Sequence, residues 1–321
     1  MNKIKFLVFI QIVSCASFFA QNIQTKNVNY SRIPFELNND NRILIPVCID
    51  GITYTMEFDT GSNQNLFNKN GMQKILQIKS NNEDEILKCL TNNFHKANPQ
   101  IDLESLKEYV FRQFDSGQLS MTCNNIMCDS TTVNTADFKF VPENENYFSD
   151  DNSTIDGIVG LCLFGEIKNI TINYKNKIIE LNSPEISGIK TPLYYMNTLG
   201  LYFVLVNIDG VEQQALVDTG AAYISIRKEY TSDKKYTQEE LISYINEKRT
   251  VNLEENTGVQ REIQFGNSKK KYTTYSYTET KFECNPAARE ILTLINSLGF
   301  SFFEGRCIQL DFENKIMSIE E

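Results

Sequence analysis

The feature of this sequence that most constrains its fold is an internal repeat. The segment "ILIPVCIDGITYTMEFDTGSNQNLF" (43–67) matches "LYFVLVNIDGVEQQALVDTGAAYISI" (201–226). In both copies an apolar run leads into Ile-Asp-Gly, and the aspartate of an Asp-Thr-Gly motif follows that glycine by eight residues. The two aspartates, Asp59 and Asp218, are 159 positions apart. A given tripeptide is expected only about 0.04 times in such a chain, so the matched pair indicates a duplication.

The same local structure is expected in both copies. Their first runs are rich in β-branched and aromatic residues, which favour strands. Asp-Gly is a strong signal for a tight hairpin turn, and the stretches 52–58 and 211–217 then return as second strands. Each copy therefore predicts a β-hairpin whose second strand delivers an aspartate to a loop.

A second pair of matching segments, 155–181 and 296–319, lies downstream. Each runs from a glycine motif through a Phe-containing segment to a strand, an Asn-Lys turn and another strand. The turns are expected at Asn176-Lys177 and Asn314-Lys315. The connector between the units contains Pro184, Gly188 and Pro192, which are typical of a boundary. We expect one lobe over 21–186 and a second over 187–321.

The middles of the two units are less regular. Helical periodicity occurs at 82–94 and 102–114 in the first unit and at 237–248 and 285–299 in the second. These helices are expected to decorate a β framework. The stretch 118–133 is our candidate for a further hairpin.

The N-terminus predicts an export signal over residues 1–20. Lys3 and Lys5 precede the apolar run "FLVFIQIV", which is too short to span a bilayer, and Ala20 is a suitable cleavage point. We expect the protein to be periplasmic, secreted or at the cell surface. In the alternative, "IVSC" resembles a lipobox that would make Cys15 a lipid anchor. The segment after residue 20 could cover the space between the two expected lobes, or it could form an edge strand of one lobe.

Charge and cysteine content limit the classes of partner and site. The net charge is −10 and the only dense basic run is "KKK" at 269–271, so a nucleic-acid partner is not expected. No later segment is long and apolar enough for stable membrane insertion. Export permits disulfides, and the candidate pairs are Cys123 with Cys128 and Cys284 with Cys307. The chain has one histidine, His95, which disfavours a Cys/His metal site.

The chain resembles the pepsin/retropepsin clan of aspartic peptidases. The residues that carry the resemblance are "FDTGS" (58–62), "VDTGA" (217–221), "DGIVG" (156–160) and "SLGFSFFEGRCIQLDFENK" (297–315). The short downstream strands are more similar to the duplicated, retropepsin-type bacterial branch than to animal pepsin. The resemblance implies a mostly β, bilobal fold with pseudo-two-fold related lobes and a few helical insertions. It also implies a cleft between the lobes covered by a hairpin flap, for which the stretch 118–133 is our candidate.

The resemblance also implies a site. Asp59 and Asp218 would face each other across one water and share a proton, and no metal or cofactor is needed. The residues implied to support the two loops are Thr60, Gly61, Ser62, Thr219, Gly220 and Ala221. The glycines would aim N–H groups at the carboxylates, and the threonines would hydrogen-bond across the loops. Ser62 would bind the outer oxygen of Asp59, which Ala221 cannot do for Asp218.

Two glycines after the loops and one departure from the family pattern complete the expected site. Gly160 and Gly299 would allow close backbone packing behind each loop. Ser297 stands where the family has a bulky apolar residue, which questions the packing of the second loop. The expected function is that of a monomeric aspartic endopeptidase acting on polypeptides. The alternative is a non-catalytic protein that keeps the fold to bind a peptide or another partner.

Overall fold

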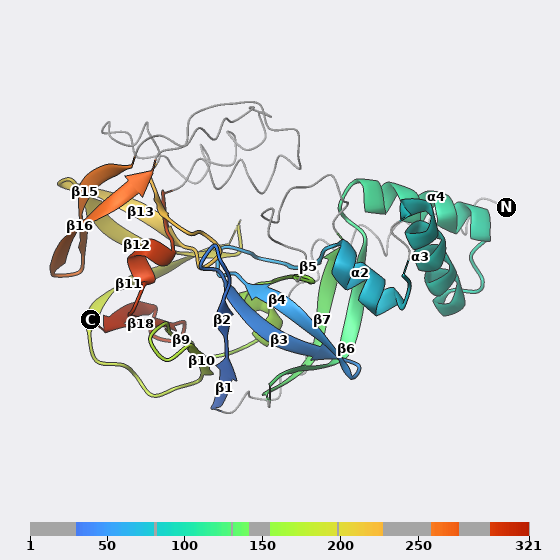
Figure 1. Cartoon of the computed structure of the whole chain (residues 1–321), viewed down its shortest axis with the longest axis horizontal. Coiled ribbons are helices and arrows are strands. Elements are labelled where there is room, and N and C mark those ends of the chain that lie inside the picture. The colour runs from blue at the N-terminus through green and yellow to red at the C-terminus, as the bar shows by residue number, and fades with distance from the viewer. Residues whose placement is uncertain are drawn as a thin grey trace.

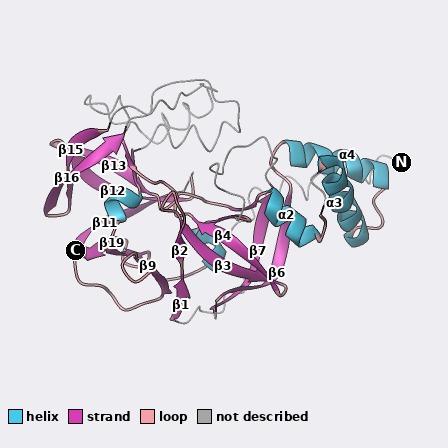
Figure 2. Cartoon of the chain, in the orientation of Figure 1, coloured by secondary structure: helices cyan, strands magenta, loops and turns pink. Residues whose placement is uncertain are grey.

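Two β-sheets dominate the computed structural model, a 12-stranded and a seven-stranded one (Figures 1 and 2). The structure describes residues 30–79, 82–129, 131–140, 155–197, 199–226, 258–275 and 296–320. The predicted mostly β, bilobal architecture is confirmed.

The seven-stranded sheet forms the first lobe, in the order β2-β3-β4-β8-β5-β7-β6. In β3 the side chains alternate between buried and more exposed, so one face builds the core. The turn between β3 and β4 has positive φ at Asp50 and Gly51, which confirms the predicted hairpin. The strands are β2 (Glu36–Leu37), β3 (Ile43–Ile49), β4 (Ile52–Phe58), β5 (Asn65–Phe67), β6 (Ser120–Cys128), β7 (Thr131–Phe140) and β8 (Gly157–Val159).

The second lobe repeats this pattern with its own hairpin and a strand behind it. Asp209 and Gly210 have the same positive φ as their counterparts in the first lobe, and β17 lies parallel to β13 as β8 does to β4. The strands are β12 (Leu201–Ile208), β13 (Val211–Val217), β14 (Ile224–Ser225), β15 (Val259–Phe265), β16 (Ser268–Tyr275) and β17 (Asn296–Leu298).

A run of six strands at one end of the 12-stranded sheet combines both halves of the chain. Their order is β1-β10-β9-β18-β19-β11, and β9 pairs antiparallel with β18 so that Thr171 lies opposite Gln309. These strands are β1 (Ser31–Pro34), β9 (Asn169–Asn173), β10 (Ile178–Leu181), β11 (Ile189–Met196), β18 (Cys307–Asp311) and β19 (Ile316–Glu320). The segment at 31–34 is therefore an edge strand. The predicted Asn-Lys turns connect β9 to β10 and β18 to β19.

We call these six strands the shared sheet. A buried polar network joins the connector between the lobes to it. The Gln309 amide donates to Thr171 Oγ1 (2.9 Å), Ser183 Oγ (3.1 Å) and the Pro184 carbonyl (2.9 Å). It accepts from the Ile186 N–H at 3.3 Å. The side chains of Gln309, Thr171 and Ser183 are buried, so their hydrogen bonds avoid the cost of leaving buried polar groups unpaired.

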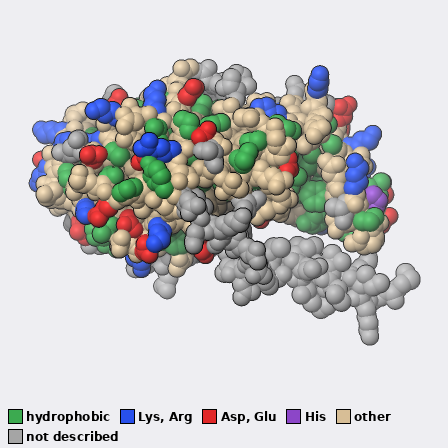
Figure 3. Space-filling model, turned by 90° about the horizontal axis from the view of Figure 1, so that it is seen from below, with side chains coloured by type: hydrophobic (Ala, Val, Ile, Leu, Met, Phe, Trp, Pro, Cys, Tyr) green, Lys and Arg blue, Asp and Glu red, His purple; other side chains and the backbone are tan. Residues whose placement is uncertain are grey.

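Helices α2 (Lys69–Leu76), α3 (Glu83–Ala97) and α4 (Leu103–Asp115) are inserted between β5 and β6. They form the outer end of the first lobe (Figure 1). The predictions over 82–94 and 102–114 are confirmed by α3 and α4, which begin after the N-caps Asn82 and Asp102. On the face shown in Figure 3, hydrophobic side chains gather at this helical end. Leu103 and Phe111 of α4 are both exposed.

Two predicted helices of the second unit have different outcomes. The stretch 237–248 lies outside the described residues, as does 285–295. The predicted helix over 285–299 is wrong at its end, because Asn296–Leu298 is strand β17, fully buried between β13 and β14. Within the described ranges, no helix has the length and apolar character needed to cross a membrane.

Candidate active site

Each aspartate follows directly on the end of a central strand. Asp59 follows β4, and its N–H donates to the Val159 carbonyl of β8 at 2.9 Å. Asp218 follows β13, and its N–H donates to the Leu298 carbonyl of β17 at 3.1 Å. A parallel strand thus anchors the start of each loop from behind, in the same way in both lobes.

The glycine after each of these backing strands allows backbone to approach closely. A Cβ on Gly160 would lie 2.2 Å from the Ser62 carbonyl oxygen. A Cβ on Gly299 would lie 2.3 Å from the Tyr223 carbonyl oxygen. Neither contact is possible for a side chain, so the loops can be held this tightly only by glycine. This is the close packing that the resemblance implies.

Thr60 and Thr219 join the two loops. The Thr60 N–H donates to Thr219 Oγ1 at 2.9 Å, and the Thr219 N–H donates to Thr60 Oγ1 at 3.1 Å. The Thr60 hydroxyl donates to the Val217 carbonyl at 2.7 Å, and the Thr219 hydroxyl to the Phe58 carbonyl at 3.0 Å. Both threonines are 1% exposed. The four bonds form the cross-loop arrangement expected of these residues.

The same loops bring the two carboxyl groups together. The Gly61 N–H donates to Asp59 Oδ1 at 2.7 Å. The Gly220 N–H donates to Asp218 Oδ1 at 3.0 Å and also to Asp59 Oδ1 at 3.2 Å. One backbone donor therefore serves both carboxyl groups, which are also hydrogen-bonded to each other.

The environment makes the two acids unequal. Burial and the negative charge of Asp59 raise the pKa of Asp218 well above its ordinary value, and its hydrogen bond to Asp59 adds to this. Burial also raises the pKa of Asp59, but the Gly61 N–H, the hydrogen bond with Asp218 and the charge of Arg42 oppose the rise. The shared proton is therefore favoured on Asp218 and the negative charge on Asp59. Such a pair offers one base and one acid at the same point.

The role expected of Ser62 is wrong. Its hydroxyl donates to the Gln64 carbonyl at 2.8 Å and accepts the Gln64 N–H at 3.3 Å. This local turn satisfies the hydroxyl within its own loop, so it is not available to the outer oxygen of Asp59. The difference between Ser62 and Ala221 is not what makes the aspartates inequivalent here.

Ser297 fits its site because a second serine faces it. In the first lobe the apolar residues Leu66 and Ile158 pair between β5 and β8. In the second lobe Ser225 and Ser297 occupy the matching positions of β14 and β17, and their hydroxyls lie 2.6 Å apart. Both are buried. A hydroxyl pair thus replaces an apolar pair, and the second loop keeps its backing strand.

A buried ion pair beside the site was missed by sequence reasoning. Arg42 Nη1 lies 3.0 Å from both carboxylate oxygens of Glu57, which is 1% exposed and two residues before Asp59. Burial raises the pKa of Glu57 to about 7, although Arg42 lowers it. The signal was an acidic residue inside an otherwise uncharged strand, next to the motif.

The flap candidate is a hairpin, but without the predicted disulfide. Cys123 and Cys128 both lie on β6 and have free thiols. A strand rises about 3.3 Å per residue, so five residues separate the two Cα atoms by roughly 16 Å, far beyond disulfide range. The predicted Cys123–Cys128 bond is therefore wrong. In the other candidate pair Cys284 lies outside the described residues, and Cys307 has a free thiol.

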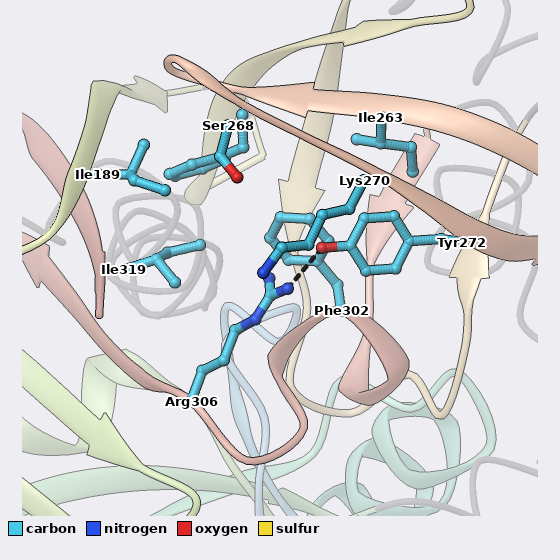
Figure 4. Close-up of a pocket in the computed structure, with 9 residues that line it drawn as sticks. Ile189, Ile263, Ser268, Lys270, Tyr272, Phe302, Arg306 and Ile319 are labelled. Atoms are coloured by element: carbon cyan, nitrogen blue, oxygen red, sulfur yellow. Dashed lines mark hydrogen bonds between the residues drawn. The ribbon is translucent and has the colours of Figure 1, made fainter. Parts of the chain in front are cut away.

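A small pocket lies between the shared sheet and the β15–β16 hairpin, away from the aspartates (Figure 4). Arg306 extends into it, donates to the Tyr272 hydroxyl at 2.6 Å and stacks on the Phe302 ring. The pocket is lined by Ile189, Ile263, Phe265, Ser268, Lys270, Tyr272, Phe302, Arg306 and Ile319. Among the residues that the structure describes, no group of three or more His, Cys, Asp or Glu side chains could hold a metal ion.

Comparison with known proteins supports the fold. A crystal structure of an aspartic proteinase from Irpex lacteus is similar to this chain, with a TM-score of 0.51 and 10% sequence identity. The match covers 91% of this chain and 97% of the other. No protein-family model and no curated protein sequence matches the chain. The structural likeness supports a bilobal pepsin-like fold, and the assignment to the bacterial retropepsin-type branch stays a prediction.

Proposed function

We propose that this protein is an aspartic endopeptidase in which Asp59 and Asp218 activate a water molecule. The observation that carries the proposal is the single Gly220 N–H that serves both carboxyl groups, at 3.2 Å and 3.0 Å. Two acids this close cannot both ionise, so they share one proton. The similar fold of a known aspartic proteinase supports the same conclusion.

The proposed reaction follows from the inequality of the two acids. Ionised Asp59 takes a proton from water, whose oxygen attacks the scissile carbonyl carbon. Protonated Asp218 donates its proton to the carbonyl oxygen, and a tetrahedral diol forms. When the diol collapses, the carbon–nitrogen bond breaks and the amine leaves with a proton returned from Asp59, while Asp218 recovers a proton from a diol hydroxyl. The carboxylic acid and the amine are the products.

The substrate that fits this proposal is an extended polypeptide between the lobes. We further propose that the protein acts after export, because residues 1–20 have the pattern of an export signal. We propose that it acts as a monomer, because a single chain carries both Asp59 and Asp218.

The proposal is tested by digesting a peptide library over a range of pH and identifying the products by mass spectrometry. Asp59→Asn and Asp218→Asn should each abolish cleavage while preserving the fold. Asp137→Asn, at an exposed position of β7, is the matched control and should cleave like the wild type. A wild-type protein that binds extended peptides but cleaves none at any pH would instead be the non-catalytic binding protein.

A further inference from the structure

The two lobes differ at one pair of matching positions beside the aspartates. Glu57 lies two residues before Asp59, and Leu216 lies two residues before Asp218. Glu57 pairs with Leu44 across β3 and β4, and Leu216 pairs with Phe203 across β12 and β13 in the same register.

The position of Arg42, the ion-pair partner of Glu57, also differs between the two lobes. Arg42 directly precedes β3, and the residue 159 positions later is Leu201. The first lobe therefore carries an ion pair where the second carries two leucines. Both leucines are buried.

The ion pair is largely removed from solvent and contributes little to the stability of the fold. Glu57 is 1% exposed and the Arg42 side chain 23%. Arg42 Nε is buried and has no hydrogen-bond partner among the described residues. A buried ion pair with an unsatisfied donor gains little over apolar residues of similar size. We therefore look for the role of the ion pair in its electrostatic effect on neighbouring ionisable groups and not in the stability of the fold.

The charges that act most strongly on Arg42 are those of Glu57, Asp59 and Asp40, which favour its cationic form and together outweigh the effect of its burial. The groups acting on Asp59 are Arg42 and Asp218, besides the N–H donors of Gly61 and Gly220. Continuing the β3–β4 register two residues past the Leu44–Glu57 pair places Arg42 opposite Asp59, and the positive charge of Arg42 lowers the pKa of Asp59. Asp218, in contrast, feels the anion of Asp59, which raises its pKa.

We propose that Arg42, held in place by Glu57, is a positioning residue that makes the two aspartates unequal by stabilising the ionised form of Asp59. This inference rests on the proposed function, because it assigns the base of that reaction. Glu57 is largely neutral in acidic solution, since burial raises its pKa to about 7. A neutral Glu57 leaves the positive charge of Arg42 without a compensating anion in that ion pair.

The test is the pH profile of kcat/KM, whose acid limb reports the ionisation of the base. Arg42→Gln removes the charge, and the double variant Arg42→Leu with Glu57→Leu copies the second lobe. Both should move the acid limb to higher pH by about half a unit or more. Arg42→Lys keeps the charge and should restore the wild-type limb. Glu57→Gln keeps a hydrogen-bonding partner for Arg42 and should not move the limb to higher pH.

The matched control is Arg261→Gln. Arg261 also has a buried Nε without a partner among the described residues and forms an ion pair with Asp209, at the far end of the second-lobe hairpin. The acid limb of the kcat/KM profile of the Arg261→Gln variant should equal that of the wild type. The inference would be overturned if the Arg42→Gln variant and the double variant folded but kept the wild-type acid limb. It would also be overturned if the acid limb of Arg42→Lys moved as far as that of Arg42→Gln. A wild-type protein without activity would instead overturn the proposed function itself.

Discussion

Thr60 and Thr219 each donate a hydroxyl hydrogen bond to the carbonyl that precedes the opposite aspartate, and each accepts the other's N–H. The two loops are therefore locked to each other and not only to their own lobes. Thr219→Val would leave the Thr60 N–H and the Phe58 carbonyl buried without partners. We expect it to lower the free energy of unfolding by about 2–4 kcal/mol, measured by denaturant titration.

The control for this change is Thr191→Val. Thr191 is also buried, but its hydroxyl makes a longer bond, 3.3 Å to the Leu205 carbonyl. Its loss should be clearly smaller than that of Thr219→Val. Equal losses for both variants would mean that the cross-loop bonds have no special weight.

A methyl group on Gly220 should disable the site without unfolding the protein. Its Cβ would lie 2.5 Å from Asp59 Cγ, so the carboxyl group would have to move. We expect Gly220→Ala to lower kcat/KM by roughly 100-fold or more, measured on a peptide that the wild type cleaves. In Gly305→Ala the added Cβ meets nothing within 4 Å, but the residue has φ +69°, so alanine there should cost about 1 kcal/mol of stability and leave kcat/KM of the folded protein unchanged.

The hydroxyl pair of Ser225 and Ser297 should behave as one unit. Either serine changed to alanine leaves the other hydroxyl buried and unpaired, at a cost of about 1–3 kcal/mol. The double alanine variant removes both polar groups and should cost less than the sum of the single variants. Denaturant unfolding of the four proteins measures this coupling, and simple additivity would show that the 2.6 Å contact has no energetic role.

Glu57 should make the stability of the folded state depend on pH. Its folded-state pKa of about 7 is above the value of about 4.3 expected in the unfolded chain. Between these values the folded state keeps the proton and the unfolded state releases it, so stability falls as pH rises from about 4 to 7. Glu57→Gln should remove a fall of about 4 kcal/mol at most. Parallel stability curves of wild type and variant between these pH values would contradict this.

Much of the first loop and its surroundings could be predicted because the determinants are local. The Asp50-Gly51 and Asp209-Gly210 turns follow from residues that tolerate positive φ. The matched spacing of the two motifs then predicts that Asp59 and Asp218 occupy equivalent places. The amphipathic helices α3 and α4 have their own periodicity and caps.

The remaining features depend on contacts between distant segments. The pairing of β9 with β18 joins residues 138 positions apart, as in Thr171 with Gln309, and no local pattern indicates it. Ser62 could bond to Asp59 or to Gln64, and only the folded loop decides. Arg42 and Glu57 are joined by the β3–β4 register, so the acidic residue was visible in the sequence but its partner was not.

The shared sheet also determines when the site can form during synthesis. Asp218 is anchored by Leu298 of β17, and the sheet beneath both lobes requires β18 and β19, up to Glu320. A ribosome makes these strands long after Asp59 has emerged. Pairings over such sequence separations also form slowly. The two aspartates can therefore reach their final arrangement only once the strands up to Glu320 have been translated.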